Sequence, residues 1–255
     1  MARKKKRKKR RIRWKAILML LGVIVSLVIL LYLIVILFET KKINITGNQY
    51  SSVQEVQEWV QSDKYSSNTL YIMWKYNKED IEQLPVIEKT SVKLESPWEV
   101  TIQVTEKAFS GRVDFNGEHL YFDKDGMAVF KSGEVIEGVP YIEGMGFDAE
   151  KVKLGEVLPA KDVKVFQKIN SITALLEQAG LTADKISCDG NSLVLYFGVV
   201  RVQMGSSGYE EKLSHMIPVL EKLQELYPER AGVLHLENYT SEDSSIQFVP
   251  DPPAE

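Results

Sequence analysis

Histidine is the commonest protein ligand for transition metals, and this chain has three histidines. His119, His215 and His235 fall in three different predicted elements, with no spacing typical of a zinc site. The sequence contains no Gly-x-Ser-x-Gly nucleophile elbow, no Walker loop and no dinucleotide-binding glycine pattern. We therefore expect no metal, no cofactor and no catalytic residues, and nothing in the sequence nominates an enzyme.

Two acidic residues before a glycine resemble part of a calcium loop, but their surroundings favour a turn. Asp123 and Asp125 precede Gly126, whereas an EF-hand loop needs further oxygen ligands and a glutamate at its twelfth position. Two aromatic-rich runs flank these residues, so 118–130 are predicted to form a hairpin with Gly126 at positive φ. Residues 205–208 lack a phosphate-holding lysine and predict a strand-to-helix loop.

Cys188 is the only cysteine, so no intramolecular disulfide can form. It lies at the end of a predicted strand, just before a turn, and this position indicates a structural role. The many carboxylates lie mostly on polar faces of predicted elements, and the sequence alone brings no pair of them together.

Charge and hydrophobicity are distributed unevenly along the chain. Residues 1–15 contain six Lys and five Arg and no acid, which leaves 21 cations against all 35 acids and a formal charge of −14 for the rest. Residues 16–38 contain no Asp, Glu, Lys, Arg or His. A helix of this length rises about 34 Å, enough to span a hydrocarbon core of about 30 Å.

A buried core helix and a cleaved signal peptide are the alternatives to a membrane anchor. The apolar run is too long for a signal peptide and no small-residue cleavage site follows it. We expect an uncleaved anchor, with Trp14, Lys15 and Ala16 at one end and Phe38 at the other. The positive-inside rule places the basic end in the cytoplasm and the C-terminal domains outside the cell. The basic run at 3–13 also suits nucleic-acid binding or nuclear import, but beside a span its role is best explained as topogenic, with some attraction to anionic lipids of the inner leaflet.

Beyond the anchor, the order of patterns predicts an α+β protein. The predicted elements of a first module at 39–107 are a strand around 43–45, a helix at 53–60 capped by Ser51 or Ser52, a second helix at 78–84, and strands at 86–94 and 99–106. A mixed α/β domain rich in antiparallel strands is predicted at 108–249, with helices at 163–179 and 210–226 and a final strand at 232–237. A flexible tail is expected at 250–255.

This layout resembles the DivIB and FtsQ family of bacterial division proteins, in particular the Gram-positive DivIB type. The resemblance is carried by residues 43–48, 84–89 and 97–107, which look like a POTRA domain, and by 121–126 and 139–144, which look like the family's β domain. It implies a non-enzymatic scaffold, enriched at the division septum, that binds FtsL-type and DivIC-type (FtsB-type) single-span proteins. That assembly is linked to the septal peptidoglycan synthase.

The resemblance also implies a site, because in related proteins a partner adds an extended segment at the C-terminal end of the β domain. The matching residues here are Leu234, His235, Leu236, Glu237, Asn238, Tyr239 and Thr240, with Gln247 and Phe248 flanking them. Tyr239 and Phe248 are candidate anchors, and the alternative is that both pack in the core. The competing functions are a POTRA-containing transport or secretion factor and an anchored cell-wall enzyme.

Overall fold

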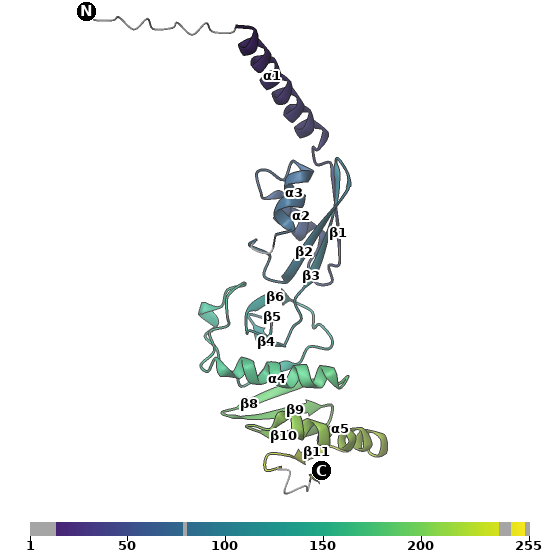
Figure 1. Ribbon diagram of the computed structural model, residues 1–255. Coiled ribbons are helices and arrows are strands. Elements are labelled where there is room, and N and C mark those ends of the chain that lie inside the picture. The colour runs from purple at the N-terminus through teal and green to yellow at the C-terminus, as the bar shows by residue number, and fades with distance from the viewer. Residues whose placement is uncertain (1–13, 79–80, 240–245, 253–255) are drawn as a thin grey trace, which may run out of the picture. The chain divides into compact units, whose positions relative to one another are not determined.

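The computed structural model describes residues 14–78, 81–239 and 246–252, and the chain forms two compact units (Figure 1). The first comprises Met1–Glu82 with Lys89–Thr105, and the second comprises Gln83–Glu88 with Glu106–Glu255. Of the predicted basic tail at 1–15, residues 1–13 lie outside the described residues, and Trp14 and Lys15 belong to the first helix.

The first helix, α1, covers Trp14–Leu37 and confirms the predicted apolar helix. Its segment Ile17–Leu37 is the one described helix that is long and apolar enough to cross a membrane. Trp14 and Lys15 begin the helix, and Phe38 follows its last residue directly. The 24 residues of α1 extend about 36 Å.

The remainder of the first unit is a small α/β module with a three-stranded sheet in the order β1-β3-β2, in which β1 runs parallel to β3. Its elements are β1 (Lys42–Thr46), α2 (Val53–Gln61), α3 (Thr69–Tyr76), β2 (Ile87–Ser96) and β3 (Glu99–Glu106). This order is the predicted strand–helix–helix–strand–strand arrangement.

Capping side chains explain where the two helices of this module begin. The Ser52 hydroxyl accepts a hydrogen bond from Glu55 N at 3.0 Å and caps α2, as predicted. The Asn68 side chain caps α3 by accepting bonds from the backbone N–H groups of Leu70 and Tyr71. Each helix then buries side chains four residues apart against the sheet, which include Val56 and Val60 in α2.

The prediction of a second helix at 78–84 is wrong. That helix is α3, and the described residues between 78 and 84 are not helical. Ile72 and Tyr76 of α3 are buried four residues apart, whereas the 78–84 segment leads into Pro85, which disfavours helix in the residue before it.

The second unit contains a nine-stranded sheet in the order β12-β11-β10-β9-β8-β7-β4-β5-β6. Its strands are β4 (Gly111–Phe115), β5 (Glu118–Phe122), β6 (Ala128–Ser132), β7 (Tyr141–Glu143), β8 (Lys185–Asp189), β9 (Ser192–Phe197), β10 (Val200–Gly205), β11 (Gly232–His235) and β12 (Gln247–Pro250). The helical elements are η1 (Ala149–Lys151), α4 (Lys164–Gln178) and α5 (Tyr209–Leu226). The mixed α/β character rich in antiparallel strands is confirmed, while β4, β7 and η1 were not predicted as separate elements.

A single hydrophobic core joins this sheet to its two long helices. Alternate strand residues are buried, and α4 and α5 pack their apolar stripes on the same cluster. The predicted β5–β6 hairpin is present, with Gly126 at φ +78° in its turn. Pro218 lies inside α5, and Gly208, at φ +71°, precedes the helix as its N-cap.

Candidate protein-interaction site

The nine-stranded sheet has two edge strands, and the chain itself covers part of one of them. At β6, Ala128 N donates to Glu156 O at 2.9 Å, and Gly155 N donates to Ala128 O at 2.7 Å. Leu158 N also donates to Gly126 O at 2.8 Å, just before the strand. The start of this edge is therefore already occupied by backbone of the same unit.

The opposite edge strand, β12, pairs only with β11 among the strands that the structure describes. Three of its four side chains are exposed: Gln247, Val249 and Pro250. An edge strand presents unpaired backbone groups that can pair with another chain. Pro250 is tolerated in this strand because a proline has no N–H group to donate to a neighbouring strand, and an edge strand has no such neighbour on its outer side.

Side-chain packing seats β12 firmly on β11. Phe248 pairs with Leu234 in the antiparallel register, and its half-buried ring packs against the core. Arg201 of β10 forms an ion pair with Asp251, directly after the strand. Asp251 N also donates to Ala231 O at 2.9 Å. The edge is therefore a fixed part of the sheet and presents its outer side in a defined register.

The structure places the sequence-predicted partner residues around this edge, but in different environments. Leu234 and Leu236 are fully buried in the core. β11, which contains Leu234 and His235, lies between β10 and β12, so its backbone is already paired on both sides. An added strand cannot pair with β11 while β12 is in place.

After His235 the chain leaves the sheet, and its course is fixed by polar contacts. His235 Nδ1 lies 2.9 Å from Glu237 Oε1. The buried Lys212 of α5 donates to Met204 O at 2.8 Å and to Glu237 O at 3.2 Å. Burial lowers the pKa of Lys212, and the nearby Glu237 carboxylate partly offsets this effect.

The remaining predicted residues separate into exposed, half-buried and undescribed ones. Asn238 is exposed in the turn that follows Glu237. The ring of Tyr239 is half-buried against the core, and its centroid lies 5.1 Å from that of His215 on α5. Thr240 lies outside the described residues. Packing in the core thus accounts for Tyr239 without a partner.

Sequence reasoning missed the two most exposed apolar members of this edge, Val249 and Pro250. A signal for them was present, because the alternation of 246–249 predicts a strand and a proline directly after such a run favours an edge position. The candidate interaction site is therefore the outer side of β12.

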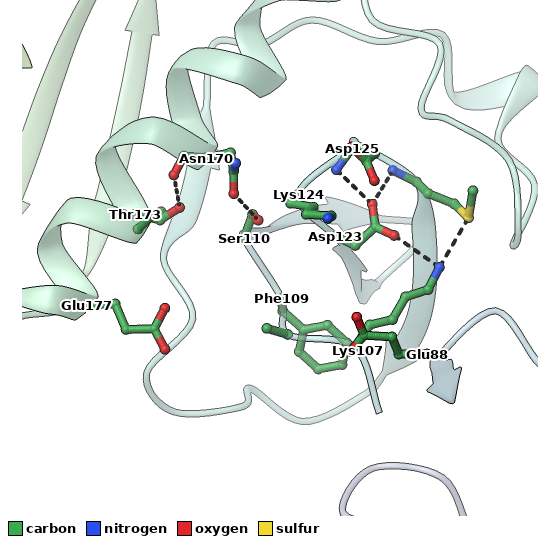
Figure 2. A pocket seen from close by; sticks show the side chains of 13 residues that line it. Glu88, Lys107, Phe109, Ser110, Asp123, Lys124, Asp125, Asn170, Thr173 and Glu177 are labelled. Carbon is green, nitrogen blue, oxygen red and sulfur yellow. Dashed lines mark hydrogen bonds and ion pairs between the residues drawn. The ribbon is translucent and has the colours of Figure 1, made fainter. Parts of the chain in front are cut away.

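A second surface feature of this unit is a cavity of about 430 Å³, shown in Figure 2. Two of its polar side chains, Lys107 and Asp123, stabilise the fold locally. Lys107 Nζ lies 3.1 Å from Asp123 Oδ2, while Asp123 Oδ1 accepts bonds from the N–H groups of Asp125 and Met127, both at 3.0 Å. Asp123 thus acts in turn chemistry, as predicted.

Other groups that could react are dispersed or buried. The three histidines lie in β5, α5 and β11, and no cluster of metal-ligating side chains is present in the described residues. Burial raises the pKa of the Cys188 thiol to about 11, so the sulfur is protonated at neutral pH. The geometry of the described residues thus supports binding at an edge strand more directly than catalysis.

Comparison with known proteins agrees with this architecture. Residues 38–107 match the family model described as POTRA domain, FtsQ-type. The chain is 28% identical over 223 residues to the cell division protein DivIB of Clostridium botulinum strain Hall, covering 84% of this chain and 85% of that protein. It is 27% identical over 221 residues to DivIB of the Loch Maree strain, with the same coverage. The predicted resemblance to the DivIB and FtsQ family is confirmed.

Proposed function

We propose that this chain is a membrane-anchored, non-enzymatic scaffold of the cell-division machinery that binds other single-span division proteins outside the membrane. The observation that carries the proposal is its similarity to DivIB proteins over 84% of its length. The similarity supports a role in cell division, and the open edge of β12 adds a surface suited to a partner. The expected partners are FtsL-type and DivIC-type (FtsB-type) proteins and, indirectly, the septal peptidoglycan synthase, and through them the scaffold helps to stabilise or regulate septal peptidoglycan synthesis.

The proposed topology rests on α1 and on the charges around it. The helix is long and apolar enough to cross the bilayer, and eleven cations precede Ala16. The positive-inside rule then retains the amino terminus in the cytoplasm and exports both folded units. In this topology the described residues after Phe38 lie outside the cell, where the exported segments of other single-span proteins can reach them.

The proposed binding mode is the addition of an extended partner segment to β12. Backbone hydrogen bonds supply affinity in such complexes, and alternate side chains supply specificity. Val249, which is 40% exposed, offers apolar area on the strand, and the exposed Gln247 offers a polar contact. The sequence prediction was centred on 234–240 with Gln247 and Phe248 flanking, whereas the proposed site is centred on β12 (Gln247–Pro250).

Co-purification of the full chain with full-length FtsL-type and DivIC-type partners tests this proposal. Val249→Asp introduces a charge that an added strand would desolvate, so partner affinity is expected to fall by about tenfold or more. Val157→Asp is the matched control, because Val157 is an exposed valine (47%) beside the opposite edge of the same sheet.

Loss of binding in Val249→Asp alone, with an unchanged melting temperature, supports both the scaffold and the edge. Equal binding by the wild type and both variants rejects β12 as the interface and leaves the scaffold standing. Failure of the folded wild-type chain to bind either partner rejects the scaffold.

A further inference from the structure

Exposed aromatic side chains are concentrated in the small module that follows α1. Tyr65, Trp74 and Trp98 are 58%, 59% and 45% exposed. Among the described residues beyond α1, the other aromatic side chain exposed to this degree is Tyr227. Large aromatic rings are costly to leave in water, and a group of them on one small module indicates a surface that is covered in use.

Hydrogen bonds tie this aromatic surface to the residues directly after α1. Thr69 N donates to Phe38 O at 2.9 Å, so the start of α3 is fixed to the end of the apolar helix. Lys41 N donates to Trp98 O at 2.9 Å, which fixes the β2–β3 turn at the same place. Asn68 N donates to Tyr65 O at 3.1 Å, so Tyr65 lies one turn away from this junction.

The rings on this surface form a continuous row with cations beside it. The centroids of Tyr65 and Tyr71 lie 5.4 Å apart, and those of Tyr71 and Trp74 lie 5.9 Å apart. Lys78 Nζ lies 3.4 Å from the centroid of Trp74, and Lys64 Nζ lies 5.6 Å from that of Tyr65. This combination of aromatic rings and lysines is the one enriched where proteins meet the membrane–water interface.

Chain length limits how far the residues bonded to Phe38 and Lys41 can lie from the bilayer surface. A bilayer has a hydrocarbon core of about 30 Å and a total thickness of about 40–45 Å, so each headgroup layer is roughly 5–8 Å deep. Residues 38–41 extend at most about 14 Å beyond α1 when fully stretched. The residues bonded to Phe38 and Lys41 therefore lie within or just above the headgroup layer when α1 spans the bilayer.

We propose that the row of Tyr65, Tyr71 and Trp74, together with Trp98, docks on the outer surface of the bilayer that α1 crosses. The rings would enter the glycerol and headgroup region, and Lys64 and Lys78 would reach lipid phosphates. This inference rests on the proposed membrane anchor. Its consequence is that the module is held against the bilayer instead of swinging freely on residues 38–41.

The test uses the full chain reconstituted into vesicles of phosphatidylethanolamine and phosphatidylglycerol in equal parts. The chain has four Trp residues, so replacing Trp14, Trp59 and Trp98 by Phe leaves Trp74 as the only tryptophan fluorophore. A matched variant retains only Trp59, whose ring packs 4.9 Å from Tyr76. Lipids brominated near the top of the acyl chain serve as short-range quenchers, and aqueous iodide reports exposure to water.

Docking predicts that brominated lipid quenches Trp74 several-fold more strongly than Trp59, with Trp74 shielded from iodide. Quenching of Trp74 by iodide and not by brominated lipid overturns the proposal. If the triple variants do not fold, the quenching of Trp74 is obtained instead as the difference in quenching between the wild type and Trp74→Phe.

Two further experiments test the contribution of the lysines and the membrane insertion of α1 separately. Lys64→Glu with Lys78→Glu should reduce the quenching of Trp74 in phosphatidylglycerol vesicles and have a smaller effect in pure phosphatidylcholine. Retention of the chain in the membrane after an alkaline carbonate wash tests α1 independently. A retained chain with an unquenched Trp74 rejects docking alone, whereas a chain that washes off rejects the anchor on which the proposed function also depends.

Discussion

The ring of Phe248 occupies the space over the α-carbon of Gly232, so that a Cβ atom at position 232 would lie 2.4 Å from Phe248 Cζ. The same atom would lie 2.7 Å from the carbonyl oxygen of Val249. The absence of a side chain at position 232 therefore allows β12 to lie close to β11. The edge strand proposed to receive the partner is seated by this contact.

Gly232→Ala is expected to displace β12 and to weaken partner binding together with stability. Overpacking of a buried position typically costs about 1–3 kcal/mol. Gly133→Ala is the control, because a Cβ atom there meets open space. Denaturant unfolding and partner co-purification are the measurements, and a Gly232→Ala chain with unchanged values of both would contradict the seating role.

Tyr239 is predicted to act as a core residue and not as a partner anchor. Its half-buried ring packs against the core and lies tilted beside the ring of His215, so Tyr239→Lys should lower the melting temperature, by several degrees for a loss of about 1–3 kcal/mol. Tyr239→Phe should preserve both folding and partner binding. Loss of binding in Tyr239→Lys with an unchanged melting temperature would return the interface to the residues first predicted.

The β5–β6 turn should be intolerant of a side chain at Gly126. This residue has φ +78°, and a Cβ atom would lie 2.5 Å from the ring of Phe166. The left-handed conformation costs a non-glycine residue about 1–2 kcal/mol, and the clash adds to this. Gly117 also has a positive φ, but a Cβ atom there meets open space. Gly117→Ala should therefore lose only the stability that the left-handed conformation costs. Equal losses in the two variants, measured by urea unfolding, would refute the contact with Phe166.

Acid should weaken the first module through Asp63. The ammonium of Lys75, with the backbone N–H of Tyr65, lowers the pKa of Asp63 to about 2. Because this folded-state pKa lies below the unfolded value of about 3.9, the contact stabilises the fold above pH 4 and is lost as the pH falls toward 2. Lys75→Met should raise the pKa of Asp63, while Lys64→Met should not. Carboxyl titration by NMR measures both, and an Asp63 that titrates near 4 in the wild type would rule the contact out.

Cys188 should be nearly inert in the native chain. Its thiol has a pKa of about 11 because burial disfavours the thiolate, and the thiolate is the reactive form. Reaction with a disulfide reagent at pH 8 should be at least about 100-fold slower than in the urea-unfolded chain. Rapid stoichiometric labelling of the folded chain would contradict this environment.

Strong local signals predicted most of the fold. Alternating apolar residues in 99–106 and the cap at Ser52 needed no tertiary information. The second helix was misplaced because Thr69–Tyr76 has apolar residues around most of its surface, whereas 78–84 has the charged pattern of an exposed helix. The side chain of Asn68 was the missed signal, since asparagine is a preferred N-cap.

The candidate site was predicted less well because an edge is a property of the whole sheet. The sequence shows that 232–237 and 246–249 are apolar and extended, but not which of them lies outermost. Only the pairing of β11 with β10 on one side and β12 on the other decides this. Leu234 and Val249 are both aliphatic, so their residue types do not reveal that Leu234 is fully buried and Val249 is exposed.

The shortness of β7 has a mechanical consequence for the second unit. β4–β6 and β8–β10 are two antiparallel blocks, and the three residues of β7 are the strand between them. β7 meets β4 at the single residue pair Arg112 and Tyr141.

Helix α4 bridges the two blocks. The ring of Phe166 lies 5.5 Å from that of Phe122 in one block, and Lys168 bonds to Asn191 between β8 and β9 in the other. The side chains of α4 therefore add contacts between the two blocks at the place where the sheet is connected only by the short strand β7, so they would resist separation of the blocks under load.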